Sequence, residues 1–171
     1  MRIHNVVTIC ILIVISSLQS TIFSAIAFNG IKPNLLLVLI ILTALLRGSS
    51  VGMIFGVVAG FFQDVFSGKV LGIYMLLGLY VGLLAGIINK RLYKENVFVA
   101  VSFTFLFTVI YEACIFIFSI FILKGGDLTL AFREIIIPEA IWNSIFALIL
   151  FFPLIKYINW IDKSVEYKKK Y

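Results

Sequence analysis

The sequence predicts an all-α, polytopic integral membrane protein with about six transmembrane helices, two of them short. The 171 residues are 63% hydrophobic and 13% charged, whereas a soluble domain is about 45–50% apolar and about 25% charged. A soluble core of this size could not hide so much apolar surface. The apolar runs also continue without interruption for between 14 and 27 residues, whereas the strands of a membrane barrel alternate apolar and polar residues.

Six apolar runs account for the predicted helices, and the first covers residues 6–28. The triplet Ala25-Ile26-Ala27 resembles a small-x-small cleavage site, so a signal peptide is the alternative for this run. We favour a transmembrane helix because the run is long and further spans follow at once. A single transmembrane domain then continues with helices at residues 33–46, 51–66, 70–88, 97–123 and 135–158, before a basic tail at 159–171.

The second and third runs are short, at 14 and 16 residues. A helix needs roughly 20 residues to cross about 30 Å of hydrocarbon. These two helices therefore either thin the bilayer or form a re-entrant pair across residues 33–66. Both arrangements return the chain to the same side, so the prediction for the later helices does not change.

Basic residues are divided unevenly between the two sides of this predicted topology. Six crossings place both termini on one side, together with the turn at Arg47 and the loop at 89–96, and that side carries ten basic residues. The opposite side carries four: Lys32, Lys69, Lys124 and Arg133. Because loops rich in lysine and arginine stay in the cytoplasm, both termini are predicted to be cytoplasmic.

Basic residues crowd the C-terminus of a chain whose net charge is +6. Such a tail fits the anionic headgroups of a lipid bilayer. The sequence lacks the interleaved basic and aromatic residues that would indicate nucleic-acid binding. Five of the basic residues lie there: Lys156, Lys163, Lys168, Lys169 and Lys170.

Two glycine ladders are the most informative motif of the chain. Glycine costs a water-exposed helix about 1 kcal/mol relative to alanine, whereas small residues four apart let membrane helices approach closely. The ladders predict close packing, either between the third and fourth helices or against the helix of a partner. They consist of Gly52, Gly56 and Gly60, and of Gly78, Gly82 and Gly86.

Asp64 follows Gln63 near the outer end of the first ladder. A carboxylate in hydrocarbon needs water or a partner, and Lys69 is a candidate at the membrane surface. The charge beyond the second ladder, Lys90, lies at the opposite surface and cannot serve. We therefore expect Asp64 to turn outward and the first ladder to contact another protein.

Glu112 lies deep within the run 97–123 and must be protonated, hydrated or paired. Tyr111 and Asn143 are the nearest candidates for hydrogen bonds to it. Glu139 follows Pro138 and is interpreted as the first-turn acid of the last helix. We therefore expect no second deep acidic residue beside Glu112.

Residue patterns typical of catalysis are missing from the sequence. His4 is the only histidine, and Cys10 and Cys114 lie in apolar runs without a CxxC pair. No serine–base pair, phosphate-binding loop or acidic pair is recognisable. The sequence predicts a protein that is not an enzyme and binds no cofactor or metal.

An ordered set of motifs over residues 19–90 resembles the rod shape-determining protein MreD family. The motifs are residues 30–37 (Gly-Ile-Lys-Pro-Asn-Leu-Leu-Leu), Arg47-Gly48, the first ladder with Gln63-Asp64, and Ser67-Gly68 before Leu71-Gly72. The family commonly has Pro-Asp where this chain has Pro33-Asn34, which argues against an essential charge at that position.

The resemblance implies a non-catalytic membrane scaffold of the bacterial cell-elongation machinery, located in the cytoplasmic membrane. Its expected partner is MreC, which connects it to MreB filaments and to peptidoglycan synthases. The alternative is a solute-binding membrane subunit, similar to the substrate-capture component of energy-coupling-factor transporters. Such a subunit needs converging polar groups, and the candidates in this chain are Asp64, Tyr74, Glu112 and Asn143.

Overall fold

The computed structural model describes residues 31–67, 72–89, 96–123 and 127–169 of the chain. Across these ranges the regular structure is helical, as the sequence predicts, and contains no strand. Three described helices are long and apolar enough to cross a membrane, within 49–66, 97–120 and 128–160, and two shorter apolar helices accompany them. The apolar run at 6–28 lies outside the described residues, so the count of six spans and the orientation of the termini stay predictions.

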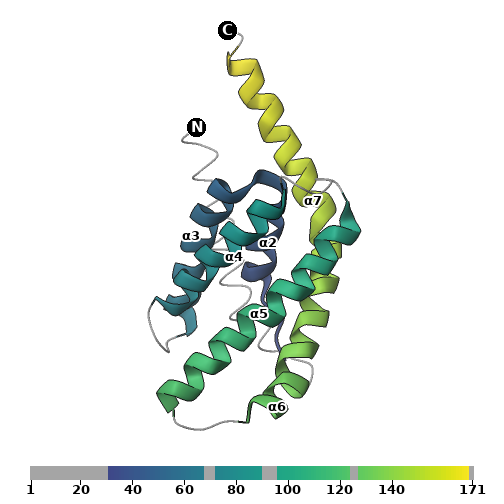
Figure 1. Cartoon of the computed structure of the whole chain (residues 1–171). Coiled ribbons are helices and arrows are strands. Elements are labelled where there is room, and N and C mark those ends of the chain that lie inside the picture. Colours follow the sequence, from purple (N-terminus) through teal and green to yellow (C-terminus); the bar gives the residue numbers. More distant parts are fainter. Residues whose placement is uncertain (1–30, 68–71, 90–95, 124–126, 170–171) are drawn as a thin grey trace.

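Helix α2 (Leu35–Arg47) is the central element of the described bundle (Figure 1). All ten residues from Leu36 to Leu45 are buried, and α3, α4, α5 and α7 all pack against it. A helix that is apolar all round is covered by other helices or by lipid, and for α2 the neighbouring helices provide this cover. Its 13 residues span about 20 Å, which is less than the hydrocarbon thickness.

Local signals explain where α2 begins and ends. Asn34 caps its first turn, because the side-chain Oδ1 accepts the backbone N–H of Leu37 at 3.1 Å. Gly48 ends it with a φ of 90°, a conformation that favours glycine, and its N–H donates to the carbonyl of Ala44 at 2.8 Å. The chain then enters α3 (Ser49–Ser67) directly.

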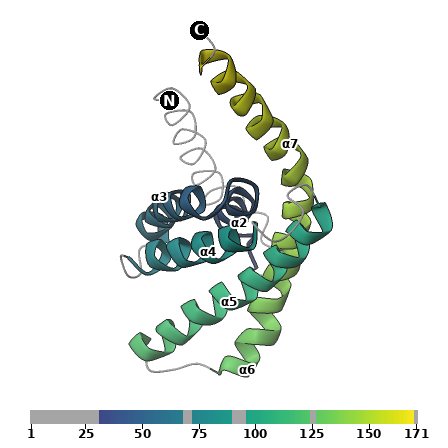
Figure 2. The same cartoon turned by 45° about the horizontal axis from the view of Figure 1, so that its top comes forward.

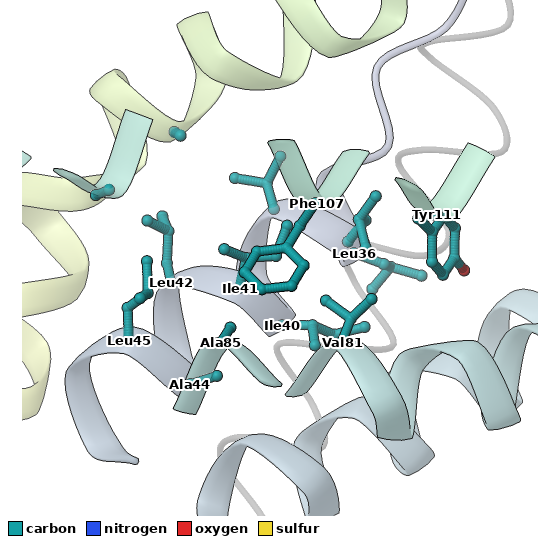
Figure 3. Close-up of a cluster of buried hydrophobic side chains, with 14 of the residues drawn as sticks. Leu36, Ile40, Ile41, Leu42, Ala44, Leu45, Val81, Ala85, Phe107 and Tyr111 are labelled. Atoms are coloured by element: carbon teal, nitrogen blue, oxygen red, sulfur yellow. The ribbon is translucent and has the colours of Figure 1, made fainter. Parts of the chain in front are cut away.

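Helices α3 and α4 (Ile73–Asn89) form an antiparallel pair that packs against α2 (Figures 1 and 2). Gly72, with a φ of 101°, immediately precedes α4. The apolar centre of the bundle lies between α2, α4 and α5, where Ile40 and Ile41 meet Val81 and Phe107 (Figure 3). Tyr111 lies at the edge of this cluster, with its hydroxyl pointing away from it.

Helix α5 (Val97–Leu123) covers the range expected from its apolar run. It packs against a second long segment, in which α6 (Leu128–Ala131), a π-helical turn η1 (Phe132–Ile136) and α7 (Ile137–Lys169) follow one another without a break. Residues 128–134, expected to belong to a loop, are therefore helical. Asp127 explains this early start, because its Oδ1 accepts the N–H of Thr129 at 2.8 Å and caps the segment.

Pro138 is the second residue of α7, and Glu139 lies in the first turn of this helix, as the sequence predicts. The helix nevertheless continues directly from η1, which ends at Ile136, so Pro138 does not mark where the helical segment begins. A proline lacks the N–H that an α-helix needs and crowds the preceding turn, and a π-helical turn is one way to accommodate it. Helix α7 contains a second proline, Pro153, and continues to Lys169. Its C-terminal part extends past the other helices (Figure 1), and this includes residues expected to form the tail.

Candidate functional site

The six ladder glycines lie in one seam, in which α3 and α4 contact each other through their backbones. A Cβ atom added at Gly52 or Gly78 would lie 2.5 Å from the carbonyl oxygen of Gly82 or Gly56, respectively. Added Cβ atoms at Gly56 and Gly82 would come even closer to the same opposing residues. Successive glycines of one ladder therefore meet successive glycines of the other in antiparallel order.

The ends of this glycine seam are as close as its centre. Gly60 faces the backbone of Tyr74 and Met75, and Gly86 faces Ser49. Because both backbones approach each other, each helix needs its own stripe without side chains, and two ladders make a single contact. The expectation that the first ladder contacts another protein is therefore wrong for the glycine face of α3, which α4 covers.

Asp64 also joins α3 to α4, through hydrogen bonds beyond the last ladder glycine of α3. Its two carboxylate oxygens accept the backbone N–H groups of Tyr74 and Met75, each at 3.1 Å, and the side chain is 2% exposed. These donors lie in the first turn of α4, where the N–H groups have no partner within the helix and the helix dipole is positive. Asp64 thus turns toward α4 rather than outward.

A second set of hydrogen bonds joins α2, α5 and α7. The backbone N–H of Asn34 donates to Oδ1 of Asn143 at 2.7 Å, and the Asn143 amide donates to the hydroxyl of Thr108 at 3.3 Å. All three residues are buried. Asn143 is therefore bound to α2 and α5 through these contacts, and Pro33, which precedes Asn34, is also buried.

Tyr111 joins α5 to α3. Its hydroxyl donates to Oε1 of Gln63 at 3.1 Å, and its ring lies 6.3 Å from the ring of Tyr74 on α4. The side chain is 1% exposed, so this hydrogen bond satisfies a hydroxyl that has little access to solvent. Gln63, expected only as a neighbour of Asp64, thus links α3 to α5.

Glu112 and Glu139 are hydrogen-bonded to each other through their side chains. Glu139 is 8% exposed and lies in the first turn of α7, as expected, but α7 continues α6 and η1 without a break. The expectation that Glu112 has no acidic companion is therefore wrong. The misleading signal was Pro138, which lies at the start of α7 but not at the start of the continuous helical segment.

These residues form one polar cluster within the apolar bundle. Tyr111 lies within electrostatic range of Asp64, Tyr74, Glu112 and Glu139. Arg47 lies at the other end of α2, away from Asn34, and is exposed. The members of the polar cluster are Asn34, Gln63, Asp64, Tyr74, Thr108, Tyr111, Glu112, Glu139 and Asn143.

The chemistry of the polar cluster is that of hydrogen bonds between helices. Its carboxylate, amide and hydroxyl groups pair with backbone N–H groups or with one another. Within the described ranges, no group of three or more His, Cys, Asp or Glu side chains is placed to hold a metal ion. The arrangement fixes five helices relative to one another at one end of the bundle.

Comparison with known proteins gives one match. A family model described as rod shape-determining protein MreD matches residues 1–161, a range that includes both glycine ladders and the whole polar cluster. No curated protein and no solved structure matches the chain.

Proposed function

The chain belongs to the MreD family of rod shape-determining proteins, and from this premise we propose that it is a non-catalytic scaffold of the cell-elongation machinery. In this proposal the protein lies in the bacterial cytoplasmic membrane with both termini in the cytoplasm. It binds MreC, and through MreC it connects MreB filaments to peptidoglycan synthases. The family supplies the shape-determining role, whereas the partners and the orientation are the content of the proposal.

One observation carries the scaffold role: the buried polar side chains hold the helices to one another. Asp64 uses both oxygens on the start of α4, and Asn143 contacts both α2 and α5. Each unsatisfied polar group would cost about 1–3 kcal/mol in such an interior. Pairing them within the chain favours a rigid bundle, which suits a protein that positions other proteins.

The solute-binding alternative draws on the same residues. Asp64, Tyr74 and Glu112 lie around Tyr111, as a site for a polar solute requires. A solute would have to compete with the hydrogen bonds that Asp64 and Asn143 already make within the chain. Native mass spectrometry of the protein released from membranes separates the two functions, because a retained small molecule supports the solute-binding alternative.

We place the MreC contact on the outward faces of the ladder helices. The glycine seam is covered, so only the opposite faces of α3 and α4 remain accessible to a partner helix. They carry large exposed apolar side chains, which pack against lipid or another helix equally well. The residues are Ile54, Phe61 and Val65 on α3 and Leu76, Tyr80 and Leu84 on α4.

Site-specific photocrosslinking in living cells tests this contact. A photoreactive residue at Phe61 or Tyr80 is expected to crosslink MreC, whereas one at Ile149, on the exposed face of α7, serves as the control. Crosslinks at Ile149 alone would overturn the placement, and crosslinks at none of the three would overturn a contact through these helices. Leucine at Gly56 is unsuitable as a test because it would separate α3 from α4.

A further inference from the structure

The contact between α5 and α7 contains two polar rungs, and each rung is a pair of side chains, one from α5 and one from α7. Thr108 pairs with Asn143, with 3.3 Å between the hydroxyl and the amide nitrogen. One turn along, Glu112 pairs with Glu139. Residues four apart lie on the same face of a helix, so two antiparallel helices bring both pairs together in the same register. The first rung therefore supports the position of the second independently.

The second rung has a chemical requirement that the first does not have. An ionised carboxylate has only acceptor atoms, so a hydrogen bond between two carboxyl groups requires a proton on at least one of them. We propose that Glu112 and Glu139 hold a proton between α5 and α7, and that this proton is a ligand which keeps the two helices together at this rung. The inference does not depend on the proposed function.

The surroundings make the loss of that proton costly. Tyr111 of α5 lies within electrostatic range of both glutamates, of Tyr74 on α4 and of Asp64 on α3, and α2 contributes the uncharged Asn34. Arg133 and Glu134 of η1 are exposed. Two ionised carboxylates in contact would repel each other strongly in a poorly solvated seam. Transfer of the proton to water or hydroxide therefore pushes α5 away from α7 at this rung.

Double electron–electron resonance, which measures the distance between two spin labels, detects this movement in the full chain reconstituted in lipid nanodiscs. Spin labels are attached to cysteines at Ile110 and Ile141, which are exposed positions on α5 and α7, after serine replaces Cys10 and Cys114. The distance between the labels is expected to increase as the pH rises from about 5 to about 9, a range that spans the titration of perturbed carboxyl groups.

Glutamine at either position provides the decisive comparison. In Glu112→Gln or Glu139→Gln the amide donates to the remaining carboxyl group whether or not that group is ionised. The distance between the labels should then be the same at every pH. Glu134→Gln removes an exposed acidic residue outside the pair and should keep the pH response of the native chain.

Infrared spectroscopy adds a direct readout of the proton. The native chain should show the carbonyl band of a protonated carboxyl group, and this band should fade over the same pH range in which the distance between the labels increases. A native chain whose label distance does not change with pH, or one that responds in the same way as both glutamine variants, overturns the proposal. A carbonyl band of the native chain that stays unchanged over the pH range in which the distance increases also overturns it. Two independent variants keep the test valid if one of them fails to fold.

Discussion

Asp64 shows how a helix terminus can hold a carboxylate inside an apolar bundle. Its oxygens accept two N–H groups of the first turn of α4, which are the donors that a helix cannot satisfy by itself. The carboxylate and the helix end therefore remove each other's desolvation cost, and the contact fixes α4 against α3. A substitution of Asp64 is therefore expected to weaken the interface between α3 and α4.

Replacing Asp64 by alanine is expected to lower the free energy of unfolding by about 2 kcal/mol, because a helix cap and two buried acceptors are lost. Thermal or denaturant unfolding of the purified chain in mild detergent measures the change. Asp127→Ala is the matched control, because Asp127 caps an exposed turn through one hydrogen bond and its loss should cost much less. Equal losses would contradict the role assigned to Asp64.

Asn143 makes a similar prediction at the centre of the bundle. Asn143→Leu keeps the volume but removes the acceptor of the Asn34 N–H and the donor to Thr108, at an expected cost of about 1–3 kcal/mol. Adding Thr108→Val should then cost less than it does alone, since the two residues share one hydrogen bond. Additive losses in the unfolding measurement would exclude this coupling. Asn159→Leu, at an exposed position, should leave stability nearly unchanged.

At the scale of elements, the glycine seam determines how closely α3 and α4 approach. Gly56→Ala would place a Cβ against the carbonyl group of Gly78, and neither backbone can move without separating the helices. We expect a loss of about 1–3 kcal/mol, the usual cost of overpacking. Val65→Ile adds one methyl group to the exposed face of the same helix and should be neutral. Unfolding transitions that shift equally in both variants would show that the seam tolerates side chains.

Helix positions were predictable where the apolar run alone decides them. The 27 residues of α5 coincide with their run because no proline, glycine or charged cluster interrupts it. The last helical segment was predicted to begin at residue 135, since Arg133, Glu134 and Pro138 resemble a loop followed by a helix start. The cap at Asp127 and the turn η1 override that local pattern, and neither is evident from hydropathy.

The polar cluster was only partly predictable, because it depends on the register between helices. Glu112 and Asn143 were recognised as polar residues in apolar runs, but their contacts were not. The available signal was a shared spacing: Thr108 and Glu112 are four residues apart, as are Glu139 and Asn143. Two such pairs on neighbouring antiparallel helices predict two polar rungs.

At the scale of the whole molecule, α2 connects two helix pairs. The glycine seam joins α3 to α4, the polar rungs join α5 to α7, and the buried α2 contacts all four helices. The polar cluster gathers the C-terminal end of α3, the N-terminal ends of α2 and α4, and residues of α5 and α7. Hydrogen bonds thus fix the bundle at the end that the sequence predicts to lie near the outer face of the membrane.

Cysteine labelling decides whether that end is the outer one. In a chain with serine at Cys10 and Cys114, a cysteine replaces either Thr129, exposed at the start of α6, or Ser50, exposed where α2 meets α3. The excess of basic residues on the Arg47 side predicts that this side is cytoplasmic. A membrane-impermeant maleimide should therefore label Thr129→Cys in intact spheroplasts but label Ser50→Cys only after permeabilisation. The reverse result would invert the bundle and place the polar cluster near the cytoplasm, where an extracytoplasmic partner could not reach its connecting turns.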